Sequence, residues 1–478
     1  MKLKNTGFLV GLLLLLSSCS NWLDVDLINE VEEEKLFSTE QGFHEALAGI
    51  YSKMSKSELY GAEMTFGVVD VLAQTYDYSN MLADYNSLVN YNYAMEDAKG
   101  YIESLWSSGY YTIAMINNLL KYEANSGDVM TDKVRKQIKG EALALRAWMH
   151  FDLWRLFAPS YGQDAQMKKL PYNREFGVET TELSTSEQFL KACIEDCTEA
   201  LKCLENDPII KVKPYMLADK NESDQYVARI NYYAVKGLLA RIYITRNAPG
   251  DKELARTLAE EVINSERFAL MEYRKAFGTE TDTKWDILFS DEHIFSLRNK
   301  KIREYSEVHH RVDPGPGNTG NLQMSPDLKS EVYAGSANDI RLNRWVAEAG
   351  VMLRKYYLSE ANAEAIVPKV PMMKLSEMYL IAAEGWLDED AEKAKSLVET
   401  MRKSRFMDVG GEYKLTSLNS EVLLSEMRRE YLCEGQMFFA YKRLHHDILR
   451  QAAPGNIKAS NEVFVLPIPE VEEEYGNR

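Results

Sequence analysis

The strongest constraint on the fold is a series of segments in which apolar residues recur at the spacing of an amphipathic helix. These segments are 43–53, 102–121, 133–157, 186–205, 230–246, 252–266, 372–387, 390–405 and 421–450. Apolar residues three and four positions apart share one face of a helix, and that face must be buried against another element. We therefore expect a chain built mainly of packed helices.

Residues 133–157 carry apolar side chains on two faces rather than one. Trp148 and Leu156 belong to one face, whereas Phe151 and Trp154 belong to the other. A helix that is apolar on two faces packs between neighbours, as in stacked helix pairs.

Short connections join neighbouring segments, as where Pro249 and Gly250 separate 230–246 from 252–266. Paired helices at this spacing are typical of tetratricopeptide-like units, although the sequence has no clean repeat of about 34 residues. We predict an all-α fold, namely an irregular α-solenoid of tetratricopeptide-like helix pairs with loop-rich insertions.

Two stretches interrupt the helical segments. Residues 57–100 are polar and rich in tyrosine, and residues 270–365 include a run at 305–327 that is rich in proline and glycine. Proline and glycine prevent regular helix in that run. Because long loops in a compact protein are usually functional or disordered, we expect ligand contacts in these two insertions.

The first residues have the pattern of an export signal. Lys2 and Lys4 precede an apolar run at 8–16 that is interrupted only by Gly11. A run of this length is too short to cross a bilayer, which needs about 20 residues. The pattern therefore predicts export and not a membrane-spanning helix.

The residues Leu-Ser-Ser-Cys at 16–19 resemble the bacterial lipobox, in which the cysteine is acylated and becomes the N-terminus after cleavage. We predict a lipoprotein signal peptide at 1–18, a lipid anchor on Cys19 and one mature domain at 19–478. Several buried acyl chains hold a protein stably on a membrane. The alternative is a plain secretory signal followed by a coincidental cysteine.

Composition excludes some functions. The formal net charge is −17, which argues against a general nucleic-acid binder because phosphate recognition needs clustered lysine and arginine.

The spacing of the other cysteines is not that of a small disulfide-rich domain. These cysteines are Cys193, Cys197, Cys203 and Cys433. No histidine lies near Cys193 and Cys197, so we interpret them as buried apolar residues and predict no metal site.

Catalytic motifs are also missing from the sequence. It contains no G-x-S-x-G, H-E-x-x-H or P-loop motif, and we predict neither an enzyme nor a cofactor. Ion pairing and capping explain the carboxylates inside the helical segments, Glu141, Asp152, Glu377, Glu384, Glu430 and Glu434. A pair of carboxylates facing each other across a sugar bond, as in a glycosidase, stays open as an alternative.

Tyrosine alternates with asparagine between residues 76 and 93. Aromatic rings stack on the apolar faces of sugars while amides and carboxylates bond their hydroxyl groups. The ligand-binding candidates here are Tyr76, Tyr78, Tyr85 and Tyr91. In the later insertion they are Trp285, Tyr305, His309 and Arg311. The alternative is that the tyrosines pack against the scaffold with only their hydroxyl groups in water.

Several blocks in a shared order resemble the SusD/RagB family of outer-membrane nutrient-binding lipoproteins. They are LFSTEQGFHEALAGIYSKM at 36–54, the spaced residues Trp106, Tyr110, Ile113 and Asn117, GEALALRAWMHFDLWRLF at 140–157, RINYYAVKGLLARIYI at 229–244, MKLSEMYLIAAE at 373–384, RREYLCEG at 428–435 and LPIPEVEEE at 466–474. Family members often have arginine and aspartate where this chain has Met437 and Ala440. That departure puts local contacts in doubt and not the resemblance.

The resemblance implies a scaffold of tetratricopeptide-like helix pairs that carries a less regular ligand-binding part. It also implies a non-catalytic protein, lipid-anchored in the outer membrane and facing the cell exterior. Such a protein captures a glycan or oligosaccharide and delivers it to a SusC-like TonB-dependent transporter. The alternatives are capture of a peptide, an α-helical surface polysaccharide hydrolase, and a structural adaptor that binds only protein.

Overall fold

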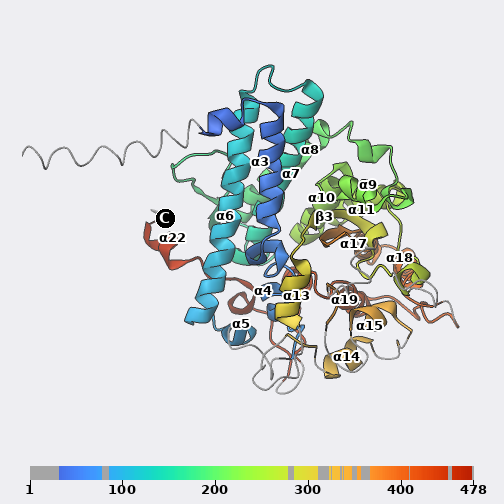
Figure 1. Cartoon of the computed structure of the whole chain (residues 1–478). Coiled ribbons are helices and arrows are strands. Elements are labelled where there is room, and N and C mark those ends of the chain that lie inside the picture. Colours follow the sequence, from blue (N-terminus) through green and yellow to red (C-terminus); the bar gives the residue numbers. More distant parts are fainter. Residues whose placement is uncertain are drawn as a thin grey trace, which may run out of the picture.

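The scaffold consists of long helices that pack in chain order, each against the next (Figure 1). In the computed structural model these helices are α3 (Glu40–Met54), α6 (Glu96–Ala124), α7 (Asp132–Phe157), α8 (Ser186–Cys203), α10 (Tyr232–Arg246), α11 (Asp251–Asn264), α17 (Leu375–Trp386) and α18 (Ala391–Lys403). The structure describes residues 32–77, 85–277, 285–310, 322–324, 326–333, 336, 338–346, 353–356, 367–407, 410–450 and 455–475. The pairs α3/α6, α7/α8, α10/α11 and α17/α18 confirm the predicted stack of helix pairs.

Shorter elements lie between the scaffold helices and after α18. They are η1 (Ser57–Gly61), α4 (Val68–Leu72), α5 (Asn86–Val89), η4 (Pro208–Ile210), η5 (Pro214–Met216), α9 (Lys220–Val227), α12 (Tyr273–Phe277), η6 (Ser290–Glu292), α13 (Ile302–His310), α14 (Pro326–Tyr333), α15 (Ile340–Trp345), α19 (Ser420–Glu430), α20 (Met437–Leu444), α21 (Asn461–Phe464) and α22 (Glu470–Tyr475). Among the described residues, no helix is long and apolar enough to cross a membrane.

Polar side chains fix where the scaffold helices begin. The Thr39 hydroxyl accepts a hydrogen bond from the Gly42 amide at the start of α3, and Thr185 and Gln188 form a capping box at the start of α8. Such caps satisfy amides that have no partner within the helix. The turn between α10 and α11 uses Asn247 and Gly250, which both have left-handed backbones.

Two small antiparallel sheets accompany the helices. Strand β1 (Lys168–Pro171) pairs with β2 (Leu183–Thr185), and β3 (His293–Arg298) pairs with β4 (Lys369–Lys374). Every residue of β3 and β4 except Arg298 is buried. The second sheet therefore continues the core between the helix pairs, and the fold stays predominantly helical.

The segment at 421–450 differs from the single helix that its periodicity suggested. It contains α19 and α20, separated by a turn in which Cys433 has φ 59° and Gly435 has φ 66°. A Cβ atom on Gly435 would lie 2.1 Å from the carbonyl oxygen of Met64. Close packing of this turn against another segment therefore ends the first helix. Met437 and Ala440 are buried in α20.

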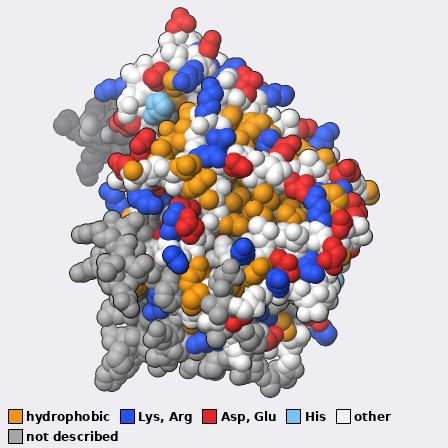
Figure 2. All heavy atoms as spheres, turned by 90° about the vertical axis from the view of Figure 1, so that its right-hand side faces the viewer, with side chains coloured by type: hydrophobic (Ala, Val, Ile, Leu, Met, Phe, Trp, Pro, Cys, Tyr) orange, Lys and Arg blue, Asp and Glu red, His pale blue; other side chains and the backbone are white. Residues whose placement is uncertain are grey.

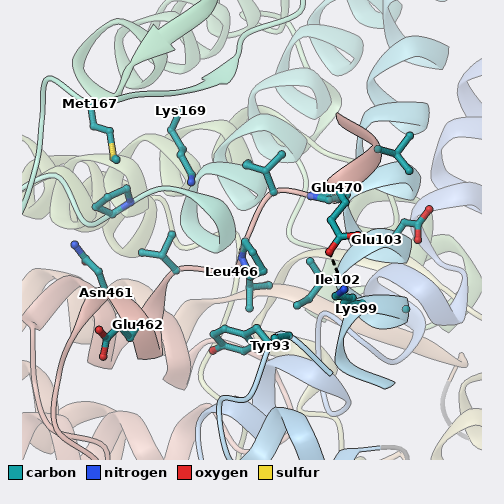
Figure 3. A pocket seen from close by; sticks show the side chains of 18 of the residues that line it. Tyr93, Lys99, Ile102, Glu103, Met167, Lys169, Asn461, Glu462, Leu466 and Glu470 are labelled. Carbon is teal, nitrogen blue, oxygen red and sulfur yellow. Dashed lines mark hydrogen bonds and ion pairs between the residues drawn. The ribbon is translucent and has the colours of Figure 1, made fainter. Parts of the chain in front are cut away.

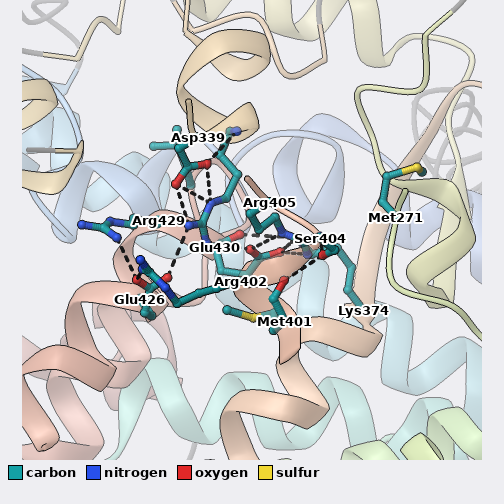
Figure 4. Close-up of polar contacts among 12 residues, drawn as sticks. Met271, Asp339, Lys374, Met401, Arg402, Ser404, Arg405, Glu426, Arg429 and Glu430 are labelled. Carbon is teal, nitrogen blue, oxygen red and sulfur yellow. Dashed lines mark hydrogen bonds and ion pairs between the residues drawn. The ribbon is translucent and has the colours of Figure 1, made fainter. Parts of the chain in front are cut away.

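A buried network of charges holds α15 and α19 against the scaffold (Figure 4). The guanidinium group of Arg341 lies 2.7 Å from Asp339 and 3.0 Å from Glu430. Arg405 lies 2.6 Å from Glu292 and 2.8 Å from Glu430. Burial alone would raise the pKa of Glu430, but its cationic neighbours lower it well below the usual range. Ion pairs thus join the later insertion to the helix pairs. Removing one partner of such a pair would leave a buried charge without its counter-charge.

One face of the molecule carries a gathering of apolar side chains. Figure 2 shows them in the middle of the face toward α9, α17 and α18, with lysine, arginine and acidic side chains around them. A surface of this kind is common on folded proteins, where apolar atoms contribute a large share of the exposed area.

Candidate functional site

Glu63, Tyr85 and His309 meet where the two predicted insertions approach each other. The Tyr85 hydroxyl lies 3.1 and 3.0 Å from the two carboxylate oxygens of Glu63, and 3.1 Å from Nε2 of His309. Nδ1 of His309 donates to the carbonyl oxygen of Tyr305 at 2.6 Å, which turns Nε2 toward Tyr85. Burial and the neighbouring Glu63 raise the pKa of Tyr85, so its hydroxyl keeps its proton and donates it to the carboxylate.

Tyr76 and His310 form a second contact beside the first. The Tyr76 hydroxyl donates to the carbonyl oxygen of Phe66 at 2.5 Å and lies 3.4 Å from Nε2 of His310. The ring of Phe66 lies between His309 and His310, with centroid distances of 5.3 and 5.1 Å. Burial lowers the pKa of His310 to about 3, so this imidazole is neutral near pH 7.

These contacts fix the ends of two segments that lie outside the described residues. Tyr76 and Tyr85 flank residues 78–84, and the side chains of both are buried, with 3% and 2% exposed. Residues 311–321 follow His310, and the amide of Leu322 donates to the carbonyl oxygen of His309 at 2.6 Å. The amide of Asp77 donates to the carbonyl oxygen of Gln323 at 2.7 Å. The described residues that border the two segments therefore lie close together, next to α4 and α13.

The other predicted residues are distributed around this place. Tyr91 is partly buried, and its hydroxyl donates to the carbonyl oxygen of Leu72 at 2.7 Å. Tyr305 is half-buried on α13. Trp285 is half-buried, and the guanidinium group of Arg344 lies 4.5 Å from the centre of its ring. Contact with a ligand stays a prediction for all of these residues.

The structure thus brings Tyr85 to His309 and Tyr76 to the adjacent His310, with Tyr305 one turn before His309 on α13, and it places Tyr91 and Trp285 against other parts of the scaffold. Cys19, Tyr78 and Arg311 lie outside the described residues. Tyr305 and Trp285 expose more of their rings than Tyr76 and Tyr85 do. Half-buried aromatic rings are the ones that can stack on a sugar without unfolding the site.

The carboxylates within the helical segments are engaged in ion pairs. Glu141 pairs with Arg229, Asp152 with Arg155, Glu377 with Arg241, Glu384 with Arg443, Glu430 with Arg405 and Glu434 with Lys355. These contacts confirm the ion pairing that the sequence suggested for these acids. Across the described ranges, no group of three or more histidine, cysteine or acidic residues is arranged to hold a metal ion. Cys193 and Cys197 are buried in α8.

Sequence reasoning missed a groove of about 1020 Å³ at the start of α6 (Figure 3). Its walls come from α6, from the chain just before and within β1, and from residues 461–471 near the C-terminus. One signal was available in the sequence, because Pro467 and Pro469 exclude both helix and central strand from that stretch.

Comparison with known families finds a match over residues 21–244 to the SusD-like family that is described as starch-binding and associating with the outer membrane. A search of curated proteins finds no significant match.

Solved structures share the fold over most of the chain. A SusD superfamily protein from Bacteroides thetaiotaomicron is similar with 22% identity and a TM-score of 0.73, covering 92% of this chain and 98% of that one. Surface glycan-binding protein A from Bacteroides uniformis is similar with 18% identity and a TM-score of 0.67, covering 92% and 99%. Surface glycan-binding protein A from Bacteroides thetaiotaomicron, in complex with laminarihexaose, has 17% identity, a TM-score of 0.66 and coverage of 92% and 98%.

Proposed function

Since the chain is SusD-like, in sequence over residues 21–244 and in fold over most of its length, we propose that it captures a carbohydrate at the cell surface without altering it chemically. The observation that carries this proposal is the shared fold with surface glycan-binding proteins, which covers 92% of this chain in each case. The starch-binding description of the matching family points to the same class of ligand.

The proposed binding surface lies around Asp77, Tyr85 and His310, which are described residues close to one another beside α4 and α13. The buried side chains of Tyr76, Tyr85 and His309 hold that place in shape, because their partners come from distant parts of the chain. Tyr305, which is half-buried on α13 at this place, is proposed to stack on a sugar ring. Trp285, which is half-buried against Arg344 on another part of the scaffold, is proposed as a separate ring contact. Tyr78 and Arg311 keep the ligand-contacting role predicted for them.

The remaining parts of the proposal concern the cellular location of the protein and its protein partner. Cys19 is proposed to carry the lipid that holds the protein on the outer membrane, facing the cell exterior. A SusC-like TonB-dependent transporter is proposed to receive the glycan. Capture for transport needs only moderate affinity, since the ligand must leave again.

Calorimetric titration of the mature chain with laminarihexaose, maltohexaose and a peptide of similar size tests the proposal. We expect saturable binding of at least one of the two glycans. Trp285→Ala and Tyr305→Ala should each weaken it about five- to tenfold, as for an aromatic contact of about 1–1.4 kcal/mol. Tyr111→Ala is the matched control, because Tyr111 is 61% exposed on α6 and should leave the affinity unchanged.

Two results would count against this function, and a third would count against the proposed contact residues. Binding of the peptide without either glycan would favour the peptide-capturing alternative. Release of shorter sugars during incubation would favour a hydrolase. Equal glycan affinity in both aromatic variants would remove Tyr305 and Trp285 from the proposed ligand contacts.

A further inference from the structure

The groove at the start of α6 has apolar residues in its lining, and no part of the described chain fills it. Tyr93, Ile102 and Leu466 line it but are almost wholly buried, whereas Val465 and Ile468 are half-buried and Met167 and Val471 have 41% and 55% of their surface exposed. Its volume of about 1020 Å³ is at the upper end of what small-molecule sites need, about 300–1,000 Å³. Figure 1 places α22 and the start of α6 on the opposite side of the molecule from α14 and α15.

One wall of the groove is an extended segment without helix or strand, residues 465–469. The amide of Leu466 donates to the carbonyl oxygen of Leu156 at 3.0 Å, which fixes the segment to the end of α7. Pro467 and Pro469 have no amide hydrogen, so this segment cannot form a continuous ladder of hydrogen bonds with an added strand. This wall therefore offers a ligand few backbone hydrogen-bond donors, and its side chains make up most of the surface that a ligand could contact.

No contact within the described part of the chain requires glycine at position 100. Gly100 lies in regular helix within α6, lines the groove, and a Cβ atom there would meet nothing within 4 Å. Gly109 of the same helix differs, since a Cβ atom there would lie 2.8 Å from the Leu153 side chain. Glycine weakens a helix interior relative to alanine. A small residue at position 100 is explained if something outside the described chain approaches α6 there.

The groove is acidic as well as apolar. The carboxylates of its lining are Glu96, Glu103, Asp164, Glu462 and Glu470, against the two lysines Lys99 and Lys169. Lys99 is already paired with Glu470 at 2.7 Å. Figure 3 shows Glu103 and Glu470 on one side of the groove and Glu462 on the other. Within the part of the chain that the structure describes, neither Glu103 nor Glu462 takes part in an ion pair, so both are available to a cationic ligand.

The charge and chemistry of the groove distinguish between the ligands that could occupy it. The chain's own residues 20–31 contain Asp24, Asp26 and Glu30 and no lysine or arginine, so the groove would repel them. A neutral glycan could donate hydrogen bonds from its hydroxyl groups to these carboxylates but would carry no charge to balance theirs. It would also find a single aromatic ring, that of Tyr93, whose hydroxyl already donates to the Val463 carbonyl oxygen at 2.6 Å.

We propose that this groove docks a segment of a partner protein in which aliphatic side chains are interspersed with lysine or arginine. The aliphatic side chains contact Val465, Ile468 and Val471, which have exposed surface in the groove, and the cations face Glu103 and Glu462. Gly100 leaves room for the segment to cross α6. This surface is separate from the proposed carbohydrate surface, so either can fail without the other.

Fluorescence anisotropy with the mature full-length chain tests the docking site. The probe is a short labelled peptide of alternating leucine and lysine, and its counterpart has glutamate in place of lysine. We expect the basic peptide to bind and the acidic one to fail, with affinity falling as salt rises. Glu103→Gln and Glu462→Gln should each weaken binding roughly threefold, the range for an exposed charge pair. Glu45→Gln, an exposed acid in α3, should change nothing.

Gly100 supplies the steric test. Gly100→Trp should abolish peptide binding by filling the groove, whereas Gly100→Ala should retain it and raise the melting temperature. Laminarihexaose titrated against Gly100→Trp should give the affinity of the unaltered chain. Equal binding of both peptides, or undiminished binding by Gly100→Trp, would overturn the proposal. So would displacement of the peptide by laminarihexaose, or self-association of the chain that Gly100→Trp abolishes.

Discussion

Replacing Tyr85 separates an anchoring role from a ligand-contacting one. Its ring is 2% exposed and stacks on Tyr101 at 4.9 Å, and its hydroxyl lies within 3.1 Å of Glu63 and His309. Tyr85→Phe removes only a hydrogen bond to a charged group, so we expect a loss of about 1.5–3 kcal/mol of stability. Tyr85→Ala also removes the buried ring, which raises the expected loss to about 3–5 kcal/mol or more.

Urea unfolding followed by circular dichroism measures the loss of stability, and glycan titration measures any loss of ligand affinity. The midpoint should fall for both variants at unchanged slope, while the folded Tyr85→Phe protein should keep its glycan affinity. Tyr111→Phe is the matched control, since an exposed hydroxyl should change stability by less than about 0.5 kcal/mol.

The opposite pattern would refute the anchoring role. If Tyr85→Ala kept the urea midpoint of the unaltered chain and lost glycan binding, Tyr85 would be a ligand contact, and the described packing around Glu63 would carry little energy. Loss of glycan affinity by Tyr85→Phe at full stability would have the same meaning.

Further predictions concern the anchor, the charge network and pH. Cys19→Ala should move the protein from the outer-membrane fraction to the soluble fraction on immunoblots, and continued attachment in cells without the transporter would contradict lipidation. Glu430→Gln leaves Arg341 and Arg405 short of a carboxylate, and the urea midpoint should show a loss of about 3–5 kcal/mol. Burial lowers the pKa of His150 to about 3. Since an unfolded histidine titrates near about 6.5, the stability from neutral His150 is present above that pH and is lost as the pH falls toward 3, by up to about 1.4 kcal/mol per pH unit. His150→Gln should flatten that pH dependence of the urea midpoint, and an unchanged slope would contradict it.

The helix stack could be predicted because its signal is local. The two apolar faces of 133–157 correspond to α7, Asp132–Phe157, which packs against α6 on one side and α8 on the other. Periodicity identifies such a helix because each face repeats within a few residues. The break between α19 and α20 could not be predicted in this way, since the close approach of Gly435 to Met64 joins residues far apart in sequence.

Less of the candidate site could be predicted from the sequence. A run of tyrosines does not reveal which rings are buried, because burial depends on distant partners. The Tyr85 hydroxyl meets a histidine 224 positions away, and Tyr76 meets one 234 positions away. The groove beside α6 likewise joins residues 93–103 to residues 461–471. These contacts leave no local pattern, so the sequence could suggest candidate aromatic residues but not the placement of their rings.

The most direct test of carbohydrate capture without catalysis is one incubation in which bound and free laminarihexaose are both measured and analysed by size. The mature chain should retain a saturable fraction of the glycan, and all of it should be recovered as intact hexasaccharide after prolonged incubation. Recovery of shorter sugars would contradict the non-catalytic function. Failure to retain this glycan and maltohexaose alike, at concentrations where the chain is folded, would contradict carbohydrate capture.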